Sequence, residues 1–139
     1  MSSALILAYV GVVLMVGVSG LASAVGALKK NGGAFGSYMI LSALPGSQGL
    51  YGFVGYFMVA SKITADIAML TAVGIFGAGL LMGIVCLASA LMQAKVCANG
   101  IAAIGNGNDV MGKTLILAAF PELYAILGVA ATFLISSAI

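Results

Sequence analysis

The run TLILAAFPELYAILGVAATFLISSAI, residues 114–139, has the length and composition of a helix that crosses a lipid bilayer. It is 26 residues long, and about 20 apolar residues suffice to span the hydrocarbon core. Its one charged residue is Glu122, the only glutamate in the chain, and Pro121 stands directly before it. The run therefore predicts a membrane-spanning helix with an acid well inside it.

The composition extends this prediction to the whole chain. Of its 139 residues, 63% are hydrophobic and only 6% are charged, which leaves too few polar residues to cover a soluble domain. The apolar runs are too long for barrel strands and lack their alternation, so the fold class is predicted to be all-α. Residues 1–13 have no basic flank, and we expect a first span there and not a cleaved signal peptide. The net charge of +2 is too small to indicate nucleic-acid binding.

Four apolar runs are separated by short polar or glycine-rich connections. We expect four transmembrane helices, at about residues 5–28, 35–61, from 67 to at least 94, and 114–139. They form two helical hairpins, residues 1–62 and 63–139, packed as one membrane domain.

The second hairpin repeats the first. LASAVGALK (21–29) recurs as LASALMQAK (87–95). At an offset of 76, the residues Gly36, Leu41, Pro45 and Gly52 match Gly112, Leu117, Pro121 and Gly128. The prediction is a tandem duplication in which both hairpins have the same orientation in the membrane.

The lysines predict the orientation. Four of them flank the first and third connections: Lys29, Lys30, Lys95 and Lys113. The middle connection has Lys62 alone. Because positive residues favour the cytoplasmic side, we expect the first and third loops in the cytoplasm and both termini outside.

Gly79 and Gly83 place a GxxxG pair in the third span, which lets helices approach closely in lipid. This pair fits packing within the chain or packing between copies in a ring, and the sequence leaves both interpretations open.

Glu122 is the residue with the strongest functional implication. An ionised carboxylate in hydrocarbon costs several kcal/mol, so it must be protonated, paired or bound to a cation. No lysine or arginine lies within the predicted spans, and Glu122 stands eight residues inside its own. This depth favours a proton or cation site over an acid tolerated at the interface.

Neutral oxygen donors accompany the acid. The repeat aligns Gly46 with Glu122, so the first hairpin lacks an acid, and LPGSQGLYG (44–52) surrounds that gap. Its residues Leu44, Ser47, Gln48 and Tyr51 share one helix face. Interhelical hydrogen bonding could also explain these polar groups. Gln93, late in the third span, is a further amide, although its predicted register places it deeper than Glu122.

This donor set suits a monovalent cation. One carboxylate with neutral oxygens is electrically neutral when it holds Na⁺. The predicted Na⁺ ligands are the backbone carbonyl of Leu44 and the side chains of Ser47, Gln48, Gln93 and Glu122. We expect Tyr51 to donate its phenol proton to the carboxylate. A proton site would need only the acid, so the extra oxygens favour Na⁺, with H⁺ as the alternative.

Other chemistry finds little support. The chain has no histidine, which excludes His-based metal sites. Cys86 and Cys97 lack a redox or metal-site pattern, and we interpret them as buried small hydrophobes. GNDVMGKT (107–114) matches the letters of a phosphate-binding loop, but such a loop needs a parallel sheet behind it, and none is predicted. No catalytic residue is expected.

In its duplicated hairpin, its FPELYAILG motif and its acid-less LPGSQGLYG motif, the chain resembles the rotor proteolipid of V-type and A-type ATPases. It is most similar to the K (or c) subunit of the bacterial Na⁺-translocating form. The resemblance implies the same Na⁺ ligands and the supporting role of Tyr51. The family often has threonine at the position of Ser47, and the hydroxyl is kept here.

The resemblance also implies partners and a location. A homo-oligomeric ring would turn in a bacterial plasma membrane against a stator subunit that carries an arginine, with a central stalk at the cytoplasmic loops and lipid around the ring. The chain itself would be a non-catalytic subunit of an ATP-driven complex. Two other classes remain as alternatives, namely a small proton-coupled multidrug exporter and a structural four-span protein. The first would be expected to have an aromatic cage and an early acid, and the second leaves Glu122 unexplained.

Overall fold

The computed structural model describes residues 24–64 and 67–139, and every regular element in these ranges is helical. Residues 24–28 are the described end of the first expected span; the rest of that span, and the start of the 21–29 repeat, lie outside the described residues. The elements that follow are η1 (Gly32–Ala34), α2 (Phe35–Ala43), η2 (Leu44–Gly46), α3 (Ser47–Ala60), α4 (Met69–Gly105) and α5 (Met111–Ala138).

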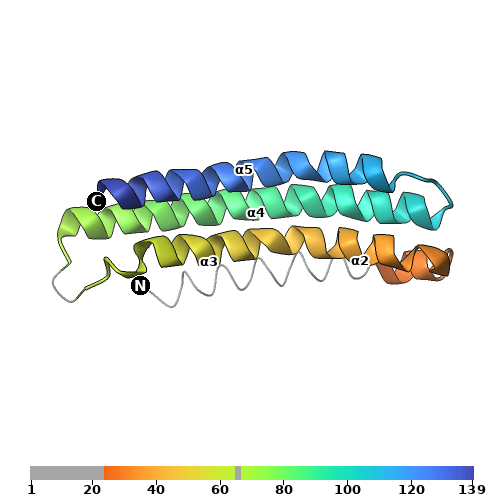
Figure 1. The fold of residues 1–139 in the computed structure, drawn as a ribbon, viewed down its shortest axis with the longest axis horizontal. Helices are drawn as coiled ribbons and strands as arrows, with labels where there is room; N and C mark the ends of the chain where they lie inside the picture. The colour runs from red at the N-terminus through yellow and green to blue at the C-terminus, as the bar shows by residue number, and fades with distance from the viewer. Residues whose placement is uncertain (1–23, 65–66) are drawn as a thin grey trace.

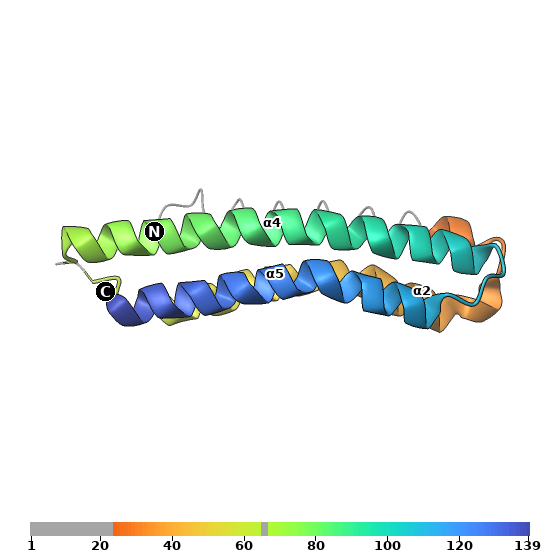
Figure 2. The same cartoon turned by 90° about the horizontal axis from the view of Figure 1, so that it is seen from above.

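The second predicted span consists of α2, η2 and α3 in direct succession, from Phe35 to Ala60. The tighter η2 turn interrupts the α-helix at Pro45, which has no N–H to donate and lies in the first turn of η2. The Ser47 N–H donates to the carbonyl of Leu44 in this turn. At the matching Pro121 the helix α5 continues without such a break, although Figure 2 shows α5 bent in its middle.

The third span was predicted to begin near residue 67 and to reach at least Ala94, and the structure shows how far it continues. Helix α4 begins at Met69 but continues eleven residues past Ala94, to Gly105. The physical reason is a helical spacing of buried residues in this extension, at Cys97, Ile101 and Ile104. Lys95 therefore lies within α4 and does not flank the loop that the sequence predicted it to flank.

In the described part of the chain, the α2–η2–α3 segment, α4 and α5 run side by side along one axis (Figures 1 and 2). Helix α4 is antiparallel to both α3 and α5, and all three contact one another. Among the described helices, α4 and α5 are each long and apolar enough to span a membrane. Only 17% and 22% of their most apolar windows are buried, whereas the core helix of a soluble protein would be mostly buried. Their apolar surface therefore faces outward, as lipid contact requires.

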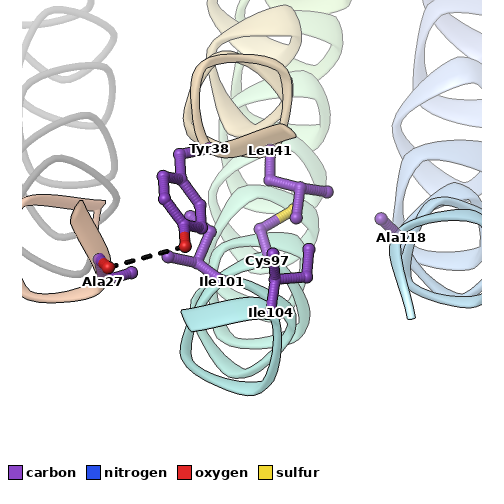
Figure 3. Packing of buried hydrophobic residues seen from close by; sticks show 7 residues of the cluster. All are labelled: Ala27, Tyr38, Leu41, Cys97, Ile101, Ile104 and Ala118. Carbon is purple, nitrogen blue, oxygen red and sulfur yellow. Dashed lines mark hydrogen bonds between the residues drawn. The ribbon is translucent and has the colours of Figure 1, made fainter. Parts of the chain in front are cut away.

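A buried apolar cluster lies toward the end of the bundle that carries the 106–110 loop. Figure 3 shows its members: Ala27, Tyr38, Leu41, Cys97, Ile101, Ile104 and Ala118. The Tyr38 hydroxyl is buried and donates to the Asn31 carbonyl at 2.9 Å. Lys30 Nζ donates to Asn106 Oδ1 at 2.9 Å. These bonds place the 29–31 turn and the 106–110 loop at the same end of the molecule.

Glycine allows α4 and α5 to pack closely. A Cβ at Gly100 would collide with the side chain of Thr114, lying 2.6 Å from its Oγ1. A Cβ at Gly128 would lie 3.3 Å from Val85. Because Gly100 faces Thr114 and Gly128 faces Val85, the parts of α4 and α5 between these two contacts lie opposite one another.

Candidate functional site

Glu122 lies at the centre of a polar cluster between α3, α4 and α5. Its Oε1 accepts a hydrogen bond from the Tyr51 hydroxyl at 2.6 Å. Its Oε2 accepts one from Gln93 Nε2 at 3.0 Å. Both donors are uncharged, so the carboxylate has hydrogen bonds but no cationic side chain among these partners. Bonds to an ionised acceptor are short and comparatively strong, which holds the carboxylate in one orientation.

Helix α4 contributes Gln93 and Ser89, which are one turn apart on the same face. Gln93 is completely buried, and its Nε2 also donates to the Ala118 carbonyl at 2.9 Å. Ser89 is 4% exposed, and its hydroxyl donates to the Pro121 carbonyl at 2.6 Å. Both α4 side chains therefore bond to the backbone of α5 beside Glu122.

Helix α3 contributes Gln48, which is 1% exposed. Its Nε2 donates to Gln93 Oε1 at 3.0 Å and to Ser89 Oγ at 3.1 Å. Its carbonyl oxygen points the other way, 3.4 Å from Ser47 Oγ. The amide of Gln48 thus joins α3 to α4 through its nitrogen and keeps its oxygen on the side of η2.

The η2 turn adds two further oxygens. Ser47 Oγ donates to the Leu44 carbonyl at 3.0 Å, a better bond than the 3.4 Å contact with Gln48. A serine hydroxyl has one proton and two lone pairs, so this bond leaves its acceptor capacity available. The tight turn at Pro45 keeps the carbonyl of Leu44 next to this hydroxyl.

Apolar side chains line the site on the side away from the 106–110 loop. Met82, Cys86 and Ala125 form a buried cluster against which Tyr51 and Val129 pack. Tyr51 thus contacts this cluster, and its hydroxyl donates to the Glu122 carboxylate. In the ranges that the structure describes, every fully buried side-chain nitrogen or oxygen has a hydrogen-bond partner. The buried polar groups therefore form a satisfied hydrogen-bond network, as expected of a binding site, and do not form a packing defect.

The structure brings together all six residues that the sequence singled out: Leu44, Ser47, Gln48, Tyr51, Gln93 and Glu122. The apparent depth mismatch of Gln93 disappears because α4 continues well past Lys95 and packs along α5. Gln93 presents its nitrogen to the carboxylate and its oxygen to Gln48, an arrangement that the sequence did not indicate.

Sequence reasoning missed Ser89. The available signal was its position four residues before Gln93, which places both residues on one helix face. Serine is common in membrane helices as a small packing residue, so the spacing alone did not single it out.

Comparison with known proteins shows which family the sequence of this chain matches. Residues 76–135, which include Gln93 and Glu122, match the family model for the C subunit of ATP synthase. The chain is 39% identical over 101 residues to the V-type sodium ATPase subunit K of Enterococcus hirae. It is 34% identical over 134 residues to the A-type ATP synthase subunit K of Methanocaldococcus jannaschii. The chain belongs to the V/A-type rotor proteolipid family.

The comparison confirms the resemblance seen in the sequence. Members of this family are integral membrane proteins of ion-transporting ATPases. The match to the Enterococcus protein covers 73% of this proteolipid and 65% of that protein. The match to the Methanocaldococcus protein covers 89% of this proteolipid and 59% of that protein. The chain thus spans less than two thirds of the length of either relative.

Proposed function

We propose that this proteolipid is the ion-carrying subunit of an ATPase rotor ring and that it binds Na⁺ at Glu122. The observation that carries the proposal is the position of this carboxylate. It is held by Tyr51 and Gln93 inside a bundle whose outer surface is apolar. Such a group has to be neutralised in a membrane, and a bound cation or proton does this.

The donor set supports Na⁺ as the cargo. The Leu44 carbonyl, the Ser47 hydroxyl and the Gln48 carbonyl oxygen follow one another at 3.0 and 3.4 Å on the α3 side. Gln93 Oε1 accepts one hydrogen bond and keeps a second lone pair. With Glu122 these are the five ligands that we propose, and they give a neutral site when Na⁺ is bound. The relative from Enterococcus is named as a sodium ATPase subunit, which agrees with this choice over H⁺.

The charge of the site links ion exchange to rotation. A filled neutral site can face lipid, whereas an empty Glu122 carboxylate cannot do so cheaply. It needs an aqueous channel or the positive charge of a stator subunit, which we propose to be an arginine. Rotation of a ring of copies, driven by ATP hydrolysis elsewhere in the complex, would then move Na⁺ across the membrane. In this proposal the chain carries the ion and performs no catalysis.

The proposed topology puts Lys29, Lys30 and Lys113 on the cytoplasmic side, against a central stalk. The bond between Lys30 and Asn106 supports a common end for the first and third loops. Lys62 lies with the C-terminal end of α5, where its Nζ donates to the Ile139 carbonyl at 2.8 Å. The four-helix duplicated hairpin and the ring remain part of this proposal.

Carbodiimide labelling of Glu122 tests the choice of ion. A carbodiimide modifies a protonated carboxyl group, and a bound Na⁺ blocks this reaction. We expect millimolar Na⁺ at a pH near 6 to protect Glu122 in the membrane-embedded protein, with K⁺ at equal ionic strength as the control. Labelling that proceeds equally with and without Na⁺ would replace the Na⁺ assignment by H⁺. Native mass spectrometry of the solubilised protein tests the ring, because a monomer or dimer would contradict it.

A further inference from the structure

Ser89 occupies a central place in the polar cluster although it is not one of the proposed ligands. Its hydroxyl accepts a hydrogen bond from Gln48 Nε2 at 3.1 Å and donates one to the Pro121 carbonyl at 2.6 Å. It is 4% exposed, so water does not offer an easy substitute for either partner. Ser89 therefore connects the proposed ligand on α3 to the backbone next to Glu122 on α5.

The direction of these bonds follows from the chemistry of the carbonyl. The Pro121 oxygen can only accept, so Ser89 must donate its single proton there. The hydroxyl then has only lone pairs for Gln48, and it requires the nitrogen of that amide. The backbone of α5 thus determines, through Ser89, which way the Gln48 amide faces.

The same reasoning applies to Gln93. The Ala118 carbonyl and the Glu122 carboxylate both accept, so Gln93 presents its Nε2 to them. Its Oε1 is left to face Gln48, where it accepts the second amide proton. Both protons of the Gln48 amide are therefore engaged, and its carbonyl oxygen is directed toward Ser47.

We propose that Ser89 is a positioning residue of the cation site, which holds the Gln48 amide with its carbonyl oxygen toward the bound Na⁺. The inference rests on the proposed function. Ser89 would act on the site through Gln48 and would not itself be a ligand of Na⁺. An amide turned by 180° would direct its N–H groups at the cation, which is electrostatically unfavourable. Ser89 opposes that turn, because the reversed amide would face the Ser89 lone pairs with its oxygen.

The substitution Ser89→Ala tests this role in the assembled, membrane-embedded protein. The readout is the Na⁺ concentration that half-protects Glu122 from carbodiimide labelling. Loss of one buried hydrogen bond that orients a ligand should raise this concentration about tenfold. The labelling rate without Na⁺ is measured in each variant as the reference for this concentration.

Ser136→Ala is the matched control. Ser136 is also a buried serine with an interhelical bond, from its hydroxyl to the Met58 carbonyl at 2.7 Å, but it has no hydrogen bond to the site. We expect S136A to leave the half-protecting concentration unchanged. Ser89→Cys keeps a weak donor of similar size and should lie between the original protein and S89A. If S89A does not assemble, the half-protecting Na⁺ concentration of S89C is compared with that of the original protein instead.

A second readout asks whether Ser89 acts through Gln48. In a Gln48→Ala background, S89A should change the half-protecting concentration less than twofold, because the amide that it orients is absent. An equal effect of S89A in both backgrounds, or no effect of S89A in the original protein, would overturn the role of Ser89 alone. Absence of Na⁺ protection in the unsubstituted protein would overturn the proposed Na⁺ function and the role of Ser89 together.

Discussion

The substitution Glu122→Gln separates the charge of the site from its shape. It exchanges one oxygen for an NH₂ group and keeps the volume of the side chain. The amide can turn its oxygen toward Gln93 Nε2 and its nitrogen toward the hydroxyl of Tyr51, which can accept as well as donate. Both hydrogen-bond positions of Glu122 can therefore be filled, and we expect the E122Q protein to fold and to form its oligomer.

The loss of charge should nevertheless abolish Na⁺ binding. A carboxylate oxygen at the ~2.4 Å typical of hard cations attracts Na⁺ by about 7 kcal/mol at an effective dielectric constant of about 20. Loss of even a third of that attraction weakens binding by roughly fiftyfold. The remaining ligands are neutral, so none of them replaces the charge.

Binding of ²²Na⁺ to the purified oligomer, together with native mass spectrometry of the same sample, checks both parts of this prediction. Asp109→Asn is the control, because Asp109 is exposed in the 106–110 loop and its loss removes a charge outside the site. We expect D109N to bind Na⁺ as the original protein does. Binding by E122Q within threefold of the original protein would refute the electrostatic argument, and failure to assemble would refute the argument about its hydrogen bonds.

Three further predictions use other parts of the structure. Ser47→Ala and Gln48→Ala should each raise the Na⁺ concentration that half-protects Glu122 by about tenfold or more, since each removes a proposed oxygen ligand; unchanged protection would remove that residue from the ligand set. Gly100→Ala should lower stability by about 1–3 kcal/mol, because the new Cβ would collide with Thr114. Gly112→Ala is the control: its Cβ meets nothing within 4 Å among the described residues, and the change should be neutral or slightly stabilising. The midpoint of thermal dissociation of the oligomer compares the two variants. Tyr38→Phe should cost about 1 kcal/mol in the same assay through its bond to the Asn31 carbonyl, and an unchanged midpoint would show that the bond contributes nothing.

Composition and span length predicted an all-helical fold, and every regular element in the described ranges is helical. The second and fourth spans were predicted to within three residues at each end, because long apolar runs in this chain end at clear polar or glycine-rich turns. The end of the third span was left open beyond Ala94, because Lys95 looked like a boundary and the sequence did not show how far the helix continues. The apolar positions after Lys95 continue the buried face of the helix. Their burial against Ala27, α2 and α5 outweighs one exposed lysine, whose long side chain can reach outward.

The composition of the site could be predicted better than its geometry. An acid that has to be neutralised in lipid is visible in the sequence, and so is a face of oxygen donors around Ser47. The directions of the two glutamine amides were not visible. They depend on which backbone carbonyls of α5 lie opposite, and that in turn depends on the register of three helices.

Under the proposed function, the polar contacts of α5 have a consequence for the release of Na⁺. Four hydrogen bonds join this helix to its neighbours at the site, and they end within little more than one helical turn, at Ala118, Pro121 and Glu122. A small rotation of α5 about its own axis would strain all four bonds at once. Opening is thus expected to be cooperative, with one closed and one open state and little population between them. The four bonds would then break together when the positive charge of the proposed stator arginine approaches Glu122.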